Sequence, residues 1–105
     1  MNYTSPIYSV EQSRTFCEWL HDLRDPVARV RITARIVMAK EGNLGDCEPV
    51  GDGMHEMRVH VGPGYRLYFT QRGQRVIFLL MGGNKTTQSR DIKRAKAMAE
   101  AMDKE

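Results

Sequence analysis

The chain has 105 residues, of which 41% are hydrophobic and 28% charged, and its net charge is +3 at pH 7. These values are ordinary for a small globular protein, so we expect one domain over residues 1–105. A membrane span is excluded by the lack of an apolar run of about eighteen residues, and the N-terminus lacks the basic start and apolar stretch of a signal peptide, so we expect a cytoplasmic location.

The first expected elements are a short strand over residues 2–8 and a helix that begins at Ser9. Pro6 cannot donate a ladder hydrogen bond, so this strand should lie at a sheet edge or carry an irregularity. Ser9 and Gln12 match a capping box, in which the serine side chain closes the start of a helix. The buried stripe of this helix is expected from Phe16, Trp19, Leu20 and Leu23.

Asp25 and Pro26 predict the start of a second helix, because Asp is a good N-cap and Pro suits the first helical position. Gly42 is a natural C-terminal stop. Two helices with so short a connection form an antiparallel hairpin. Arg31 and Arg35 lie one turn apart and are expected on a solvated face. The apolar side is expected from Val27, Val30, Ala34, Val37 and Met38.

A loop rich in Gly, Asn and Asp follows, with one short strand near residues 46–50. Two clear strands, 54–61 and 65–71, then flank a Gly-Pro-Gly turn at 62–64. Apolar and polar residues alternate in both strands, which is typical of a sheet with one buried and one open face. The next strand, 76–81, is apolar at every position, which indicates a central strand covered on both faces.

The last helix is expected from about Thr87 to Asp103, with Ile92, Ala95, Ala99 and Met102 as its buried stripe. The order of elements implies a small α+β domain with a largely antiparallel sheet. We expect the helices to cover one face of this sheet. The other face should then be partly open and carry the polar positions of the two alternating strands.

The polar side of these strands collects residues that suit a polyanion. Arg58, His60, Arg66 and Tyr68 can share one patch, because opposed side chains on antiparallel strands lie within about 5 Å of each other. Lys85 leaves the end of the central strand beside them. Lys and Arg outnumber Asp and Glu ten to five after residue 54, whereas six basic residues face eight acidic ones before it. The second half is therefore the expected binding face.

These residue types can cleave RNA without a metal or another cofactor. Arginine offers planar, bidentate donors to phosphate, and a helix N-terminus adds free N–H groups. His60 can transfer a proton near neutral pH, and Glu56 can accept one. Tyr68 can stack on a base or donate a hydrogen bond. The first turn of the last helix adds further expected substrate contacts from Thr86, Thr87 and Gln88.

The alternative is an ordinary solvated strand face. His60 alone is more often a surface residue, and Tyr68 alone is more often an aromatic cross-strand partner. Three cations on one patch repel one another unless an anion binds between them. Their presence together therefore favours an anion-binding site over an ordinary solvated face. The sequence contains no P-loop, HExxH, GxSxG or Gly-rich dinucleotide turn, and its two cysteines lack metal-ligand spacing.

At these residues the chain resembles toxins of the RelE/ParE superfamily of type II toxin–antitoxin modules, especially the addiction module killer, or HigB-like, branch. The matching segments are FCEWLHDLRD, ARVRITARI, GNLGDCEPVGDGMHEMRVHVGPGYRLYF and GGNKTTQSRDIKRA. The resemblance implies a RelE-like fold, with a helical hairpin and a C-terminal helix packed on a mainly antiparallel curved sheet. It also implies a translation inhibitor that cuts mRNA in the ribosomal A site, without metal, by 2′-OH attack.

The resemblance further implies a role for each candidate residue. Arg66 would clamp the transition state, and Arg58 and Lys85 would bind flanking phosphates. Glu56 or His60 would act as the base. Several nucleases of the superfamily also place a Tyr or His near the C-terminus, and this chain has neither there. The general acid is therefore unassigned.

The implied partners are the ribosome with its mRNA and a small helix-turn-helix antitoxin that covers the basic face. The toxin–antitoxin complex would bind its own operator DNA. Either Tyr68 or Lys85 would substitute for the missing general acid, or the chemistry differs from that of these nucleases. Two alternatives stay open, because a fold does not settle a function. One is a ParE-like inhibitor of DNA gyrase, and the other is a non-toxic remnant that only binds antitoxin.

Overall fold

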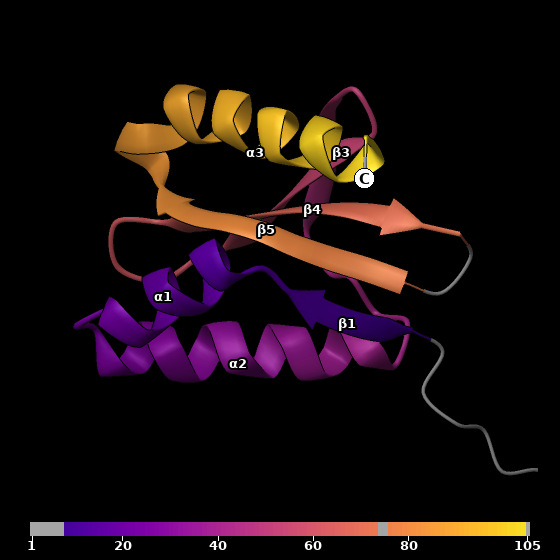
Figure 1. Cartoon of the computed structure of the whole chain (residues 1–105). Coiled ribbons are helices and arrows are strands. Elements are labelled where there is room, and N and C mark those ends of the chain that lie inside the picture. The colour runs from indigo at the N-terminus through magenta and orange to yellow at the C-terminus, as the bar shows by residue number, and fades with distance from the viewer. Residues whose placement is uncertain (1–7, 74–75, 105) are drawn as a thin grey trace, which may run out of the picture.

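The structure is a computed structural model that describes residues 8–73 and 76–104. It has five strands and three α-helices, and a short 3-10 turn precedes the last helix (Figure 1). In chain order these are β1 (Ser9–Gln12), α1 (Arg14–Asp22), α2 (Pro26–Lys40), β2 (Cys47–Gly51), β3 (Met54–Val59), β4 (Tyr65–Arg72), β5 (Val76–Asn84), η1 (Lys85–Thr87) and α3 (Gln88–Asp103).

The five strands form one mixed sheet in the order β1-β5-β4-β3-β2. Strands β2 to β5 are antiparallel to their neighbours, and β1 pairs with β5 in parallel. The expected α+β class with a mainly antiparallel sheet is therefore confirmed. β5 lies between β1 and β4, as its continuous apolar run predicts. In the described residues, no helix is long and apolar enough to cross a membrane.

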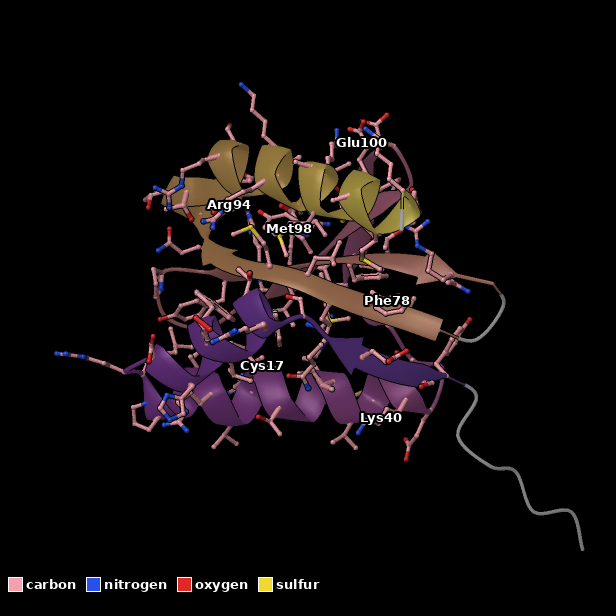
Figure 2. All side chains as sticks on the ribbon, in the orientation of Figure 1. Cys17, Lys40, Phe78, Arg94, Met98 and Glu100 are labelled. Carbon is pink, nitrogen blue, oxygen red and sulfur yellow. The ribbon has the colours of Figure 1, made fainter. Side chains whose placement is uncertain are left out.

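Helices cover both faces of the sheet (Figure 1). The α1–α2 hairpin packs on one face, where the larger apolar cluster lies. On the other face α3 covers Met54, Tyr68, Leu80 and Met81, and Phe78 and Met98 pack against this second cluster (Figure 2). The expectation that helices cover only one face is wrong. β5 is apolar on both sides, so a helix on each side removes more apolar surface from water.

The chain begins differently from the expected strand and helix. Most of the expected strand, residues 2–7, lies outside the described residues. Residues 9–12, expected as the first turn of a helix, form β1 instead. The helix is capped by Ser13, whose Oγ accepts from Phe16 N at 2.9 Å and donates to Leu80 O at 2.7 Å. The backbone hydrogen bonds that residues 9–12 form along the edge of β5 stabilise this segment more than a capping box at Ser9 would.

The second helix has the expected ends but buries the opposite face. Asp25 caps it by accepting from Ala28 N at 3.0 Å. Its buried residues are Ala28, Ile32, Ile36 and Ala39. The expected apolar side is exposed instead, and it comprises Val27, Val30, Ala34, Val37 and Met38. Apolar residues lie around most of α2, so periodicity did not select a face, whereas small alanines let the other side approach the sheet closely.

The alternation of β3 and β4 is confirmed. Met57, Val59, Tyr65, Leu67 and Phe69 all belong to the cluster beneath the α1–α2 hairpin. The polar positions between them therefore point to the face that α3 partly covers. The α3 stripe is also confirmed, with Ala95 and Ala99 buried and Ile92 and Met102 packed beside them.

Candidate functional site

The hairpin register brings the expected basic residues to one end of the sheet. Arg58 and Arg66 are directly opposed across β3 and β4, and Arg66 also faces Gly83 of β5. Lys85 N donates to Gly64 O at 3.1 Å, which ties the start of η1 to the Gly-Pro-Gly turn. The turn thus sits beside the point where β5 ends.

A pocket of about 380 Å³ lies at this turn and is lined by residues 60–64, Arg66 and Lys85. Only 13% of the Arg66 side chain is exposed, yet its terminal nitrogens have no hydrogen-bond partner among residues 8–73 and 76–104. The Lys85 ammonium has none within those ranges either. Unpaired cationic donors that converge on a pocket are suited to bind an anion, since phosphate oxygens accept several such bonds. We name this feature the turn pocket.

Arg58 turns away from the turn pocket, although it was expected to bind a flanking phosphate. Its terminal nitrogen lies 2.9 Å from Asp46 Oδ1 and 3.1 Å from Glu48 Oε1, and a quarter of its side chain is exposed. Hydrogen bonds with Asp46 and then Glu48 raise the pKa of Arg58, so the guanidinium stays charged. Arg58 therefore joins β3 to the β2 side of the sheet.

Asp46 links Arg58 to His60. Its Oδ2 lies 2.5 Å from His60 Nε2, and hydrogen bonds from His60 and then Arg58 lower the pKa of the carboxyl. A carboxylate accepts hydrogen bonds, so this contact places a proton on Nε2, and in a neutral imidazole Nδ1 is then the acceptor. Sequence reasoning treated Asp46 only as the start of a strand. Its position relative to His60 became visible only when β2 was paired with β3.

Glu56 lies in a buried polar cluster rather than on an open surface. Its side chain is 3% exposed, and Oε1 accepts from Gln88 Nε2 at 2.7 Å and Tyr68 Oη at 3.2 Å. Arg66 Nε lies 3.4 Å from the same oxygen, within ion-pair distance but without hydrogen-bond geometry. Tyr68 is fully buried, and burial followed by the Glu56 charge raises the pKa of its phenol. The expected open placement of these residues is wrong, because α3 covers them.

The start of the last helical segment does not offer the free N–H groups that we expected. Thr86 N and Thr87 N both donate to Asn84 Oδ1, at 2.9 and 3.2 Å. The Thr86 hydroxyl donates to the same oxygen at 2.6 Å, and the Thr87 hydroxyl donates to Asp91 Oδ2 at 2.5 Å. Asn84 and Asp91 therefore use the donors that a phosphate would need. Thr86 is exposed, whereas Gln88 turns inward to Glu56.

Arg35 supports the site from beneath, although we expected it to be solvated. Its guanidinium donates to Arg58 O at 2.5 Å and to Leu44 O at 3.0 Å, so it joins α2 to β3 and the loop before β2. Gly45 has a φ of 64°, and a Cβ there would lie 2.7 Å from Arg35 Nη2. Glycine is therefore required where this loop crosses the guanidinium.

No cluster of His, Cys, Asp and Glu that could hold a metal ion is found in the described part of the chain.

The sequence matches, over residues 18–103, the model of a family described as "Phage derived protein Gp49-like (DUF891)". It is also 40% identical over 93 residues to an uncharacterized protein of Haemophilus influenzae. That alignment covers 89% of this chain and 94% of the relative. The family match includes every residue of the turn pocket.

Proposed function

The chain belongs to the Gp49-like family of phage-derived proteins, and from this we propose that it is the toxin of a type II toxin–antitoxin module. In this proposal it is a RelE/HigB-like endoribonuclease that cuts mRNA on the ribosome and needs no metal. The observation that supports this proposal is the turn pocket, which is lined by Arg66, Lys85 and His60. The terminal nitrogens of Arg66 and the ammonium of Lys85 are its unpaired donors. A phosphodiester supplies the anion that these groups lack.

The proposed reaction is attack of a 2′-OH on the adjacent phosphorus. His60 Nδ1 takes the proton from the 2′-OH, because Asp46 holds the ring through Nε2. Arg66 and Lys85 donate to the non-bridging oxygens, where negative charge grows in the pentavalent transition state. The bond to the 5′ oxygen then breaks, and Lys85 is the proposed proton donor to that oxygen. The products are a 2′,3′-cyclic phosphate and a 5′-hydroxyl.

The contacts also divide the expected site residues into three groups. Arg66, Lys85 and His60 line the turn pocket, and these are proposed to touch RNA. Arg58 holds Asp46, and Glu56 holds Arg66, so both are proposed as positioning residues. Tyr68, Thr87 and Gln88 are held in internal hydrogen bonds and take no direct part in this scheme.

Cleavage on translating ribosomes tests the proposal directly. Purified protein should cut a defined mRNA within its reading frame, and the mapped RNA 5′ ends should carry a 5′-hydroxyl. Lys85→Ala should reduce cleavage at least about 100-fold, because it removes a donor to the transition state. Lys93→Ala is the matched control, since Lys93 is also exposed but lies outside the turn pocket. Intact message with the wild-type protein would contradict the proposal.

One observation favours a non-nucleolytic alternative. Arg58 pairs with Asp46 and Glu48, and Arg66 lies near buried Glu56, so both arginines already have carboxylate neighbours. A ParE-like gyrase inhibitor needs no phosphate clamp at these positions. In that case expression should induce a DNA damage response and gyrase–DNA adducts while mRNA stays intact. Continued growth without antitoxin would instead indicate a non-toxic remnant.

The outer face of α2 supports the proposed antitoxin partner. All four exposed large hydrophobic residues of the described chain lie on it: Val27, Val30, Val37 and Met38. The helix carries three arginines and one lysine but no acidic residue. A second copy of this chain would bring like charges together, so the fitting occupant is an amphipathic antitoxin helix with acidic flanks. A pocket of about 440 Å³ that includes Pro26 and Val30 borders this face.

A further inference from the structure

A second pocket, of about 340 Å³, lies where β5 passes between α1 and the start of α3. Its lining includes Trp19 of α1, Gly82 of β5, and Arg90, Asp91 and Arg94 of α3. Figure 1 shows α1 and α3 on either side of this end of β5, and Arg94 is labelled in Figure 2. We name it the edge pocket.

The edge pocket exists because β1 is short. β1 pairs with β5 only from Val76 to Leu79, so beyond Leu79 this edge of β5 has no partner strand among residues 8–73 and 76–104. Asn84 N donates to Thr87 Oγ1 rather than to β4. Peptide groups alternate between the two sides of a strand, so the N–H and C=O of Gly82 also point to the open edge.

Two glycines bring the walls of the edge pocket close to the strand. A Cβ at Gly82 would lie 2.2 Å from the Trp19 ring, and a Cβ at Gly83 would lie 1.9 Å from Asp91 Oδ2. Consecutive residues face opposite sides of a strand, so the aromatic ring and the carboxylate reach the edge from the two faces of the sheet. An aromatic surface and a carboxylate thus flank the peptide group of Gly82, which is buried.

The chemistry of these walls fits one nucleotide. A base can stack on Trp19, and the exposed guanidinium groups of Arg90 and Arg94 can bind its phosphate. Asp91 is 2% exposed; its Oδ2 accepts from Thr87, and its Oδ1 lies 3.8 Å from Arg90 Nε, an ion-pair distance without a hydrogen bond. The carboxylate can therefore accept further hydrogen bonds at the pocket wall. A peptide strand fits less well, because the open edge ends at Asn84, where η1 turns away.

We propose that the edge pocket binds the base of a nucleotide next to the one cleaved, and that Asp91 selects guanine. Guanine alone among the four standard bases presents two adjacent N–H donors on its Watson–Crick edge, and these match the carboxylate. The two pockets are neighbours, because Asn84 lines the edge pocket and Lys85 lines the turn pocket. The inference rests on the proposed RNA substrate and assigns the residues that determine its sequence preference.

Fluorescence of the full-length protein tests the inference without any nuclease assay. Trp19 is the only tryptophan and lines the edge pocket, so all tryptophan emission comes from a residue of this pocket. Titration with the four nucleoside monophosphates should give saturable quenching, strongest with GMP and weakest with UMP. Arg94→Ala should weaken GMP binding about 10-fold, and Lys93→Ala, which removes the same charge outside the pocket, should not.

Asp91→Asn gives the sharper test, because the amide keeps an acceptor for Thr87 but has only one oxygen. It should lower the GMP-to-UMP affinity ratio about 10-fold or more, whereas a purely structural role would weaken all four ligands equally. Equal binding of the four nucleotides, or no quenching with a protein that cleaves mRNA, would overturn the inference. Selective GMP binding by a protein that leaves mRNA intact would support the pocket and refute the nuclease.

Discussion

Arg66 combines a structural contact with a free binding group. Its Nε lies 3.4 Å from buried Glu56, while its terminal nitrogens have no partner among the residues described. Alternation alone places Arg66 on an open face, which predicts that Arg66→Ala leaves stability nearly unchanged. In the structure only 13% of the Arg66 side chain is exposed, so its removal should lower the stability of the fold. Loss of the guanidinium would leave the Glu56 carboxylate with neutral donors only.

We therefore predict that Arg66→Ala lowers the free energy of unfolding by about 2 kcal/mol, the range for a buried charge that loses its partner. Urea unfolding would measure it. The double variant Arg66→Ala/Glu56→Gln should recover part of the loss, because it removes the unpaired charge as well. If the two single losses simply add in the double variant, the pair does not interact. Toxicity should be lost in both arginine variants.

Asp46 gives a prediction about acid stability. Its pKa is lowered from the ordinary value of 3.8, first by the hydrogen bond from His60 and then by that from Arg58. A carboxyl with a lowered folded pKa stabilises the fold above its unfolded pKa, and this stabilisation is lost as pH falls through the folded pKa. The melting temperature of the wild type should therefore exceed that of Asp46→Asn at pH 5, and the gap should close below pH 4. A gap that stays constant down to pH 2 would contradict this origin.

At the scale of single elements, the start of α1 shows how pairing competes with capping. Ser9 and Ser13 both precede apolar residues at helical spacing, and only Ser9 has a glutamine three residues later. Residues 9–12 pair with the edge of β5 as a strand, so the helix begins later and Ser13 is its cap. A helix start predicted from local signals therefore fails where a neighbouring strand offers ladder hydrogen bonds.

Ser13→Ala should consequently destabilise the protein by about 1–2 kcal/mol, because the hydroxyl both caps α1 and donates to Leu80 O. Ser9→Ala is the matched control and should change the free energy of unfolding by less than about 0.5 kcal/mol, since Ser9 is exposed. Chemical denaturation of both variants would decide between the two caps. A larger loss of stability in Ser9→Ala than in Ser13→Ala would instead indicate that the helix begins at Ser9.

At the scale of the whole molecule, two surfaces differ in chemistry. The turn pocket carries cationic donors at one end of the sheet, whereas the outer side of α2 carries exposed apolar residues, and the two surfaces share no residue. In the proposed function the first surface meets RNA and the second meets antitoxin. Binding of antitoxin at α2 therefore need not involve the groups that would contact the phosphate.

Val30→Asp tests this separation, because Val30 is 69% exposed. The variant should keep its melting temperature and its toxicity, and it should lose affinity for the antitoxin encoded beside it at least about 10-fold, since the charge meets an apolar partner surface. Calorimetry with purified antitoxin and growth on co-expression would measure both. Ile32→Ala, on the buried side of α2, should instead cost about 2–5 kcal/mol of stability. Full rescue of growth by antitoxin against Val30→Asp would rule out this docking face.

The sequence by itself determined those features that depend on neighbouring residues in the chain. Period-two alternation predicted the parity of β3 and β4, so Arg58 and Arg66 were expected on the same face of the sheet. The register that places them directly opposite each other is a finding of the structure. Asp25 marked a helix start for the same reason, because a cap is a contact over three residues. His60, Arg66 and Lys85 all lie at this turn, as the sequence predicts.

Only the tertiary structure decided which of those positions are open. α3 lies over Glu56 and Tyr68, α2 turns its Val30 side outward, and the β2–β3 pairing brings Asp46 to His60. Backbone dihedral angles and side-chain period are local, so a pattern reveals them. Burial depends on which elements minimise the apolar surface of the whole chain together, and no single segment carries that information.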